Sequence, residues 1–90
     1  MKFKKIRNVA LSYERQGQIF FTLANYENLP PGAKKGIDEK IARAAKGSVN
    51  YEKALRDWLI HGVPFEAVLQ RHYVRDATLV RMRKEIYESW

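Results

Sequence analysis

Residues 48–90 read SVNYEKALRDWLIHGVPFEAVLQRHYVRDATLVRMRKEIYESW, and this stretch decides the fold. Its apolar side chains recur at helical spacing in three consecutive segments. The apolar positions are Tyr51, Ala54, Leu55, Trp58 and Leu59 in the first segment, Phe65, Val68, Leu69, His72 and Tyr73 in the second, and Leu79, Met82, Ile86 and Trp90 in the third. The pattern predicts three short helices in tandem, joined by tight connections.

The ends of these helices carry their own signals. Ser48 or Asn50 suits the N-cap of the first helix, and Gly62 suits its C-terminal stop. Pro64 fits the first position of the second helix, where its missing N–H leaves no hydrogen bond unmade. Asp76 is the expected cap of the third helix, which we predict to run to Trp90 with Tyr87 at the edge of its apolar stripe.

The first half of the chain gives a weaker helical pattern. Residues 13–29 place most of their apolar side chains at helical positions, although Gly17 and the β-prone run 19–22 count against a helix. The sequence Leu-Pro-Pro-Gly at 29–32 is a break. A charged helix follows and ends at Gly47, with Ile37, Ile41, Ala44 and Ala45 as its apolar positions.

Together these signals predict an all-α fold. Ninety residues are enough for one domain and too few for two separate cores. We therefore expect a compact bundle of about five helices over residues 12–90, with a tri-helical helix-turn-helix within 48–90. Residues 1–11 form a basic N-terminal arm.

Cysteine usage and hydropathy indicate the cellular compartment. The chain has no cysteine, which excludes a disulfide scaffold and a thiolate zinc site and fits a reducing cytoplasm. The start MKFKKIRNVAL resembles the charged region of a signal peptide, but residues 12–18 are polar and no apolar run follows. No stretch has the length of a membrane span. We expect a soluble, cytoplasmic protein.

The net charge of +7 is concentrated in the arm, where Lys2, Lys4, Lys5 and Arg7 stand without an acidic residue. A basic excess favours a polyanionic partner through counterion release, but it does not identify that partner. The arm fits two interpretations equally well. It can enter a minor groove, or it can be a flexible leader with no role.

Signals for an enzyme or a metal site are poor. His61 and His72 are the only histidines, and neither lies in a metal-ligand pattern. His72 stands at an apolar position and is expected to be partly buried, and His61 is placed to contact free carbonyls at a helix end. Asp38 and Glu39 are adjacent and cannot form a catalytic pair on one helix face. We expect no catalysis, no metal and no cofactor.

Residues 64–86 fit the pattern of a helix-turn-helix. This motif needs a bracing helix, a tight turn and a second helix whose N-terminal half enters the major groove of DNA. Its contact positions are apolar here, at Val68, Leu69, Val74, Leu79 and Met82. Two positions depart from the pattern, because Tyr73 stands where Gly is common in the turn and Leu69 replaces a small residue. A Tyr adopts the left-handed conformation of that Gly only at some cost, so we expect a relaxed variant of the motif.

Residues 62–90 resemble the C-terminal helix-turn-helix of small regulators encoded by phages and mobile elements, and region 4 of sigma-70-type factors. In both, a stretch of the form (S/D)-x-T-(L/V)-x-R-x-R recurs, and residues 76–83 read DATLVRMR. The resemblance covers about the last third of the chain and leaves residues 1–47 unmatched. It implies sequence-specific binding of double-stranded DNA and control of transcription.

The exposed side of the last helix supplies the candidate site. Its first turns carry small or cationic residues, and Glu85 and Glu88 come later. We predict that Arg75, Thr78 and Arg81 contact phosphates or base edges. The full predicted DNA-binding set is Arg71, Arg75, Asp76, Ala77, Thr78, Val80, Arg81 and Lys84. The alternative is that Arg81 and Lys84 are only solvated and that Arg83 extends along the helix seam.

Two functions remain after these observations. The first is a DNA-binding transcriptional regulator that docks residues 76–85 in the major groove and dimerises through residues 12–46 to cover two half-sites. The alternative is an adaptor whose basic helices dock an acidic protein. The aromatic residues are expected to pack in the core rather than stack on single-stranded bases. Those assigned to packing are Tyr51, Trp58, Phe65, Tyr73, Tyr87 and Trp90.

Overall fold

The computed structural model describes residues 3–90, and this part of the chain forms five α-helices and no strand. The helices are α1 (Tyr13–Ala24), α2 (Pro31–Ala45), α3 (Val49–Leu55), α4 (Phe65–His72) and α5 (Asp76–Glu88), with a 3₁₀ turn η1 (Tyr26–Asn28) and a π-helical turn η2 (Arg56–Ile60). The Cα radius of gyration is 12.3 Å, close to the roughly 12 Å of a compact domain of this length. The predicted all-α bundle is confirmed. None of these helices is long and apolar enough to cross a membrane.

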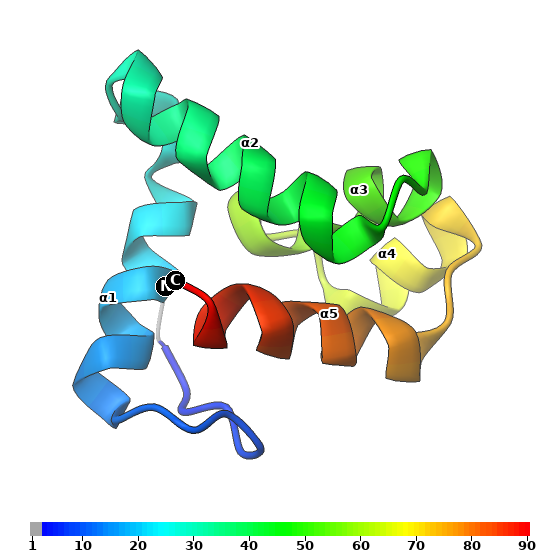
Figure 1. The fold of residues 1–90 in the computed structure, drawn as a ribbon. Coiled ribbons are helices and arrows are strands. Elements are labelled where there is room, and N and C mark those ends of the chain that lie inside the picture. The colour runs from blue at the N-terminus through cyan, green and yellow to red at the C-terminus, as the bar shows by residue number, and fades with distance from the viewer. Residues whose placement is uncertain (1–2) are drawn as a thin grey trace.

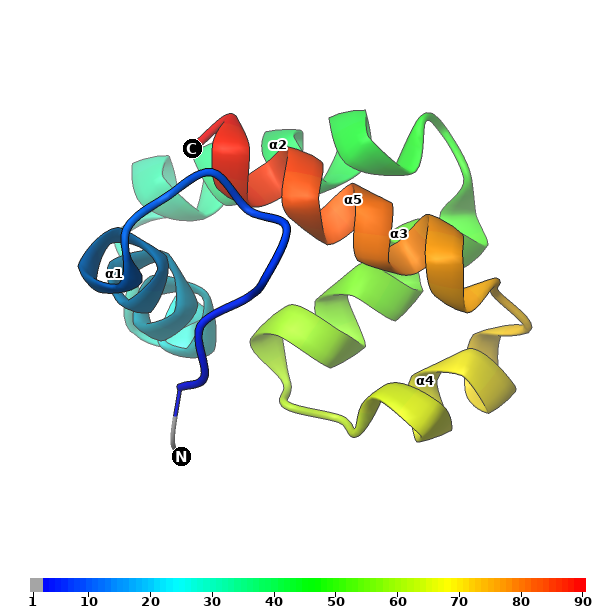
Figure 2. The same ribbon diagram turned by 90° about the horizontal axis from the view of Figure 1, so that it is seen from below.

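The α3 helix holds the C-terminal half together, since it packs against α2, α4 and α5. The α2 helix also lies along α5, and α1 packs against η2. Figure 1 shows α2 on one side of α5 and α1 crossing near the C-terminal end of α5. Figure 2 shows α4 beside the N-terminal end of α5, with the arm passing between α1 and α5.

The helix ends follow the capping signals closely. Ser48 is the N-cap of α3, and its Oγ accepts a hydrogen bond from the Tyr51 N–H at 3.3 Å. Gly62 has a φ of 69°, and the Val63 N–H donates to the Asp57 carbonyl at 2.9 Å, which closes the helix end. The other two starts differ from prediction by one position, because Pro64 and Arg75 are the N-caps of α4 and α5.

The η2 turn connects both halves of the fold. Its wider π-helical winding is closed by the His61 N–H, which donates to the Arg56 carbonyl at 3.1 Å. Arg56 donates from Nη2 to Asp38 on α2 at 2.7 Å, and Tyr26 donates its hydroxyl to the same carboxylate oxygen at 2.7 Å. Asp38 therefore ties η1, α2 and η2 together.

The core confirms the predicted inner stripe of α5. Leu79, Met82 and Ile86 are buried, and Tyr87 is buried as well rather than lying at the edge, because α1 and η2 close over it. Trp90 lies beyond the end of α5 and is only partly buried. The buried apolar residues are Val9, Ile19, Leu23, Ile37, Ile41, Ala44, Ala45, Ala54, Leu55, Ile60, Val68, Val74, Leu79, Met82, Ile86 and Tyr87.

Residues 3–11 of the arm are folded against the domain. Gln16, fully buried on α1, accepts from the Ile6 N–H at 2.7 Å and donates from Nε2 to the carbonyls of Ile6, Val9 and Leu11 at 3.1–3.4 Å. The Ala10 N–H donates to Glu88 Oε2 at 2.8 Å, across 78 positions of sequence. Met1 and Lys2 lie outside the described residues. The described part of the arm is thus clasped by α1 and α5.

Candidate nucleic-acid interface

The connection between α4 and α5 has the turn of a helix-turn-helix, with a tyrosine in the position usual for glycine. Tyr73 is left-handed, with φ 54° and ψ 47°, and this conformation ends α4. The prediction that Tyr73 packs in the core is wrong, since its side chain is 92% exposed. The left-handed backbone turns the ring away from the apolar stripe of α4, and buried Val74 fills the space inside the turn instead.

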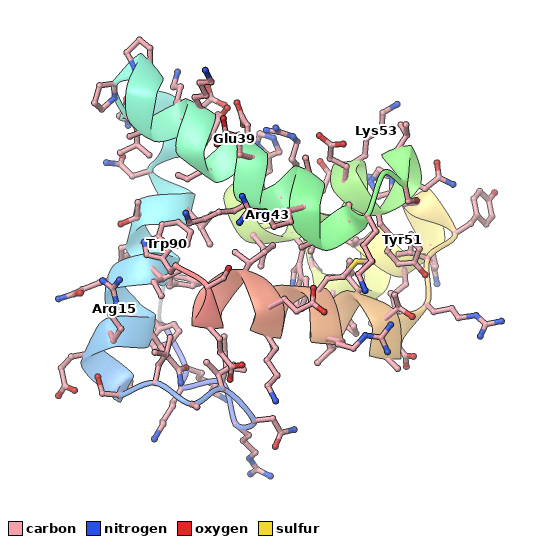
Figure 3. All side chains as sticks on the ribbon, viewed as in Figure 1. Arg15, Glu39, Arg43, Tyr51, Lys53 and Trp90 are labelled. Atoms are coloured by element: carbon pink, nitrogen blue, oxygen red, sulfur yellow. The ribbon has the colours of Figure 1, made fainter. Side chains whose placement is uncertain are left out.

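Hydrogen bonds from α3 and η2 brace this turn. The Arg75 N–H donates to the Tyr51 hydroxyl at 3.0 Å, and Figure 3 shows Tyr51 reaching from α3 towards the start of α5. At the end of α4, Asp57 Oδ2 lies 2.8 Å from His72 Nε2 and 3.1 Å from Arg71 Nη1. His72 is partly buried, as predicted. The hydrogen bond from His72, followed by that from Arg71, lowers the pKa of Asp57.

A basic groove of about 800 Å³ lies between the arm and the N-terminal half of α5. Its lining consists of Lys4, Lys5, Ile6, Arg7, Asn8, Val9, Phe65, Asp76, Ala77, Val80, Arg81, Arg83 and Lys84. Six of these side chains are basic, and Asp76 is the one acidic side chain in the lining. The cations come from two segments more than 70 positions apart, which the clasped arm brings to one surface.

The groove gathers most of the predicted site. Asp76, Ala77, Val80, Arg81 and Lys84 line it and are exposed. Arg71, Arg75 and Thr78 are not in its lining. Arg71 is drawn towards Asp57, although 56% of its side chain is still exposed. Arg75 is exposed at the N-cap of α5, and Thr78 is partly buried.

Four basic residues of the groove were missing from the predicted set. Lys4, Lys5 and Arg7 belong to the arm, where the charge concentration was the available signal. The sequence pattern could not place them beside α5, because the contacts of Gln16 and Glu88 that do so are not local. Arg83 follows one position after the inner stripe of α5, and its role depends on packing against Trp58.

Arg83 is a largely buried cation. Its guanidinium carbon lies 4.4 Å from the centroid of the Trp58 ring, a cation–π geometry. Its Nε is buried and has no hydrogen-bond partner among the described residues. Burial lowers the pKa of the guanidinium, and no carboxylate in residues 3–90 forms an ion pair with it. The side chain is therefore a positive charge without a protein counter-ion.

The described residues offer cations rather than metal ligands, since no group of three or more His, Asp or Glu side chains gathers among positions 3–90. Comparison of the chain with protein-family models, with curated proteins and with solved structures finds no match. The groove and the exposed turns of α5 are accordingly the basis for a functional proposal.

Proposed function

We propose that the protein binds double-stranded DNA and regulates transcription, in the manner of the small regulators of phages and mobile elements. The observation that carries this proposal is the basic groove, in which cations of the arm flank the exposed first turns of α5. Phosphate contacts from such cations supply affinity and position a protein on the duplex. A helix that projects beside them can enter the major groove.

The residues divide by the contact that each can make. Ala77 and Val80 are small and exposed, so they let the helix approach base edges and thymine methyl groups. Arg81 can donate two hydrogen bonds to a guanine, and the Asp76 carboxylate can accept one from a cytosine amino group. Lys84 and the arm residues Lys4, Lys5 and Arg7 face the flanking phosphates. α4 and the Tyr51 hydroxyl hold α5 at a fixed angle for this contact.

The test is a titration of duplex DNA by fluorescence anisotropy at several salt concentrations. Double substitution of Arg81→Ala and Lys84→Ala weakens binding and lowers the salt slope by about 2, one unit for each lost phosphate contact. The matched control is Arg43→Ala with Lys53→Ala on α2 and α3, outside the groove (Figure 3), which leaves the slope unchanged. Equal affinity and slope for both double variants contradict the proposal.

A second candidate function is supported by the apolar floor of the groove. Ile6, Val9, Phe65 and Val80 lie between its basic side chains. An acidic amphipathic helix has the complementary pattern and docks in grooves of this kind. The protein would then be an adaptor for an acidic protein partner. Recovery of a partner after nuclease treatment, with no measurable affinity for duplex DNA, favours the adaptor over the DNA-binding regulator.

A further inference from the structure

A second, smaller cavity lies beneath the arm. Its volume is about 210 Å³, and its walls come from the arm, α1, η2 and α5. The lining residues are Phe3, Lys4, Ile6, Phe20, Trp58, Leu59, Arg83 and Tyr87. Neither predicted contact with DNA nor the packing of the helical core uses this space.

The cavity is positively charged. Lys4 and Arg83 line it, and no acidic side chain does so among residues 3–90. A buried cation is costly unless a counter-charge or hydrogen bonds compensate it. Arg83 has neither at its Nε, since that atom is buried and makes no hydrogen bond within the described chain. An anion from outside would supply what the protein lacks.

The walls of the cavity are aromatic. The rings of Phe3 and Phe20 are 5.1 Å apart, and Trp58 holds the Arg83 guanidinium over its face. Such walls favour a flat apolar body. Apolar cavities of about 150 Å³ hold a benzene molecule, so 210 Å³ accommodates one ring and a small charged group. Burial raises the pKa of Tyr87 to about 12, so its phenol is protonated at neutral pH and is able to donate to an anion.

We propose that this cavity binds a small carboxylate that carries a single aromatic ring. The carboxylate pairs with Arg83 and Lys4, and the ring lies against Trp58 and Phe20. The site is independent of the DNA-binding proposal, because its test requires no nucleic acid.

The experiment is a titration of the full chain with benzoate, followed through the indole N–H signals of its two tryptophans by NMR. Trp58 lines the cavity, whereas Trp90 lies away from it beside Lys40 on α2 and serves as an internal control (Figure 3). The Trp58 signal shifts and saturates while the Trp90 signal stays. Acetate, benzyl alcohol and inorganic phosphate, which each lack the ring or the carboxylate, bind at least tenfold more weakly. Equal shifts of both signals, or phosphate binding as tight as benzoate, overturn the proposal.

Variants separate the site from the neighbouring groove. Arg83→Met keeps most of the side-chain volume and removes the charge, so saturable binding of benzoate is lost. Arg81→Met, in the groove but outside the cavity, binds benzoate like the unaltered protein. If Arg83→Met does not fold, Lys4→Met provides the test and weakens binding about threefold, as for one exposed charge pair. Undiminished binding in a folded Arg83→Met or Lys4→Met protein overturns the proposal.

Discussion

Tyr73 holds a left-handed backbone while its ring is almost entirely exposed to solvent. The conformation penalises any side chain with a Cβ, by roughly 1–2 kcal/mol. Burial of the ring does not offset this penalty. Gly at this position relieves the strain and loses part of the gain to the greater flexibility of the unfolded chain, about 0.5–1 kcal/mol.

Tyr73→Gly is therefore expected to raise the free energy of unfolding by roughly 0.5 kcal/mol, or the melting temperature by about 2–4 °C. Tyr73→Ala keeps the Cβ and removes only the exposed ring, so its melting temperature stays near that of the unaltered protein. Thermal unfolding followed by circular dichroism measures both variants. A Gly variant less stable than the Ala variant would show that the turn is not strained.

Among the helices, α4 is the shortest in the helix-turn-helix, and its C-terminal end depends on the Asp57 carboxylate of η2. The hydrogen bonds from His72 and Arg71 lower the pKa of Asp57 in the folded chain below the ordinary value of 3.8. A carboxyl group with a lowered folded-state pKa stabilises the fold above its unfolded pKa, and this contribution is lost as the pH falls through the folded-state pKa.

Asp57→Asn should therefore lower the free energy of unfolding by about 1 kcal/mol at neutral pH, because a charged acceptor shared by two donors becomes a neutral one. The gap between variant and unaltered protein narrows as the pH drops below 3.8. Urea unfolding over a pH series measures it. Glu66→Gln, an exposed change on α4, gives a pH-independent control. A gap that stays constant down to acid pH would rule out this role of the carboxylate.

At the same scale, the sequence predicted each helix because periodicity and capping are local properties of the chain. Ser48 and Gly62 mark real helix ends, and the helix predicted within residues 13–29 forms despite Gly17. The misassigned Tyr73 belongs to a turn, where one left-handed residue changes the direction of the next side chain. Periodicity assumes regular helical geometry and cannot register that change.

For the molecule as a whole, the question is how two helix-turn-helix units would cover a duplex. We place the contact between two copies on α1, where Tyr13 and Phe21 are each 53% exposed. Both lie within residues 12–46, the region expected from the sequence to dimerise. Large exposed aromatic side chains of this kind are typical of binding surfaces.

Double substitution of Tyr13→Ser and Phe21→Ser is expected to shift the protein from dimer to monomer in sedimentation equilibrium, with at least a tenfold increase in the dissociation constant. The matched control is Val49→Ser, an apolar side chain on α3 that is 61% exposed and lies outside residues 12–46. A protein that sediments as a monomer without any substitution, or a dimer unaffected by the double change, would exclude this interface.

The arrangement of the arm lies beyond what the sequence could predict. Its charge is visible in the order of residues, but its position depends on Gln16, a polar side chain that no apolar pattern marks as buried. The groove exists only because that amide and Glu88 hold residues 3–11 beside α5. The predicted cations of α5 were thus half of a surface whose other half is assembled by contacts distant in sequence.

The clasp at Gln16 and Glu88 also has a consequence for the order of folding. The arm's backbone groups find their acceptors and donors on α1 and on the last turn of α5. Those two helices come together only once the rest of the bundle has formed, so the arm docks last during folding and detaches first when the protein opens locally. Its amide protons should exchange with solvent sooner than those of the helices, through an opening that does not require global unfolding.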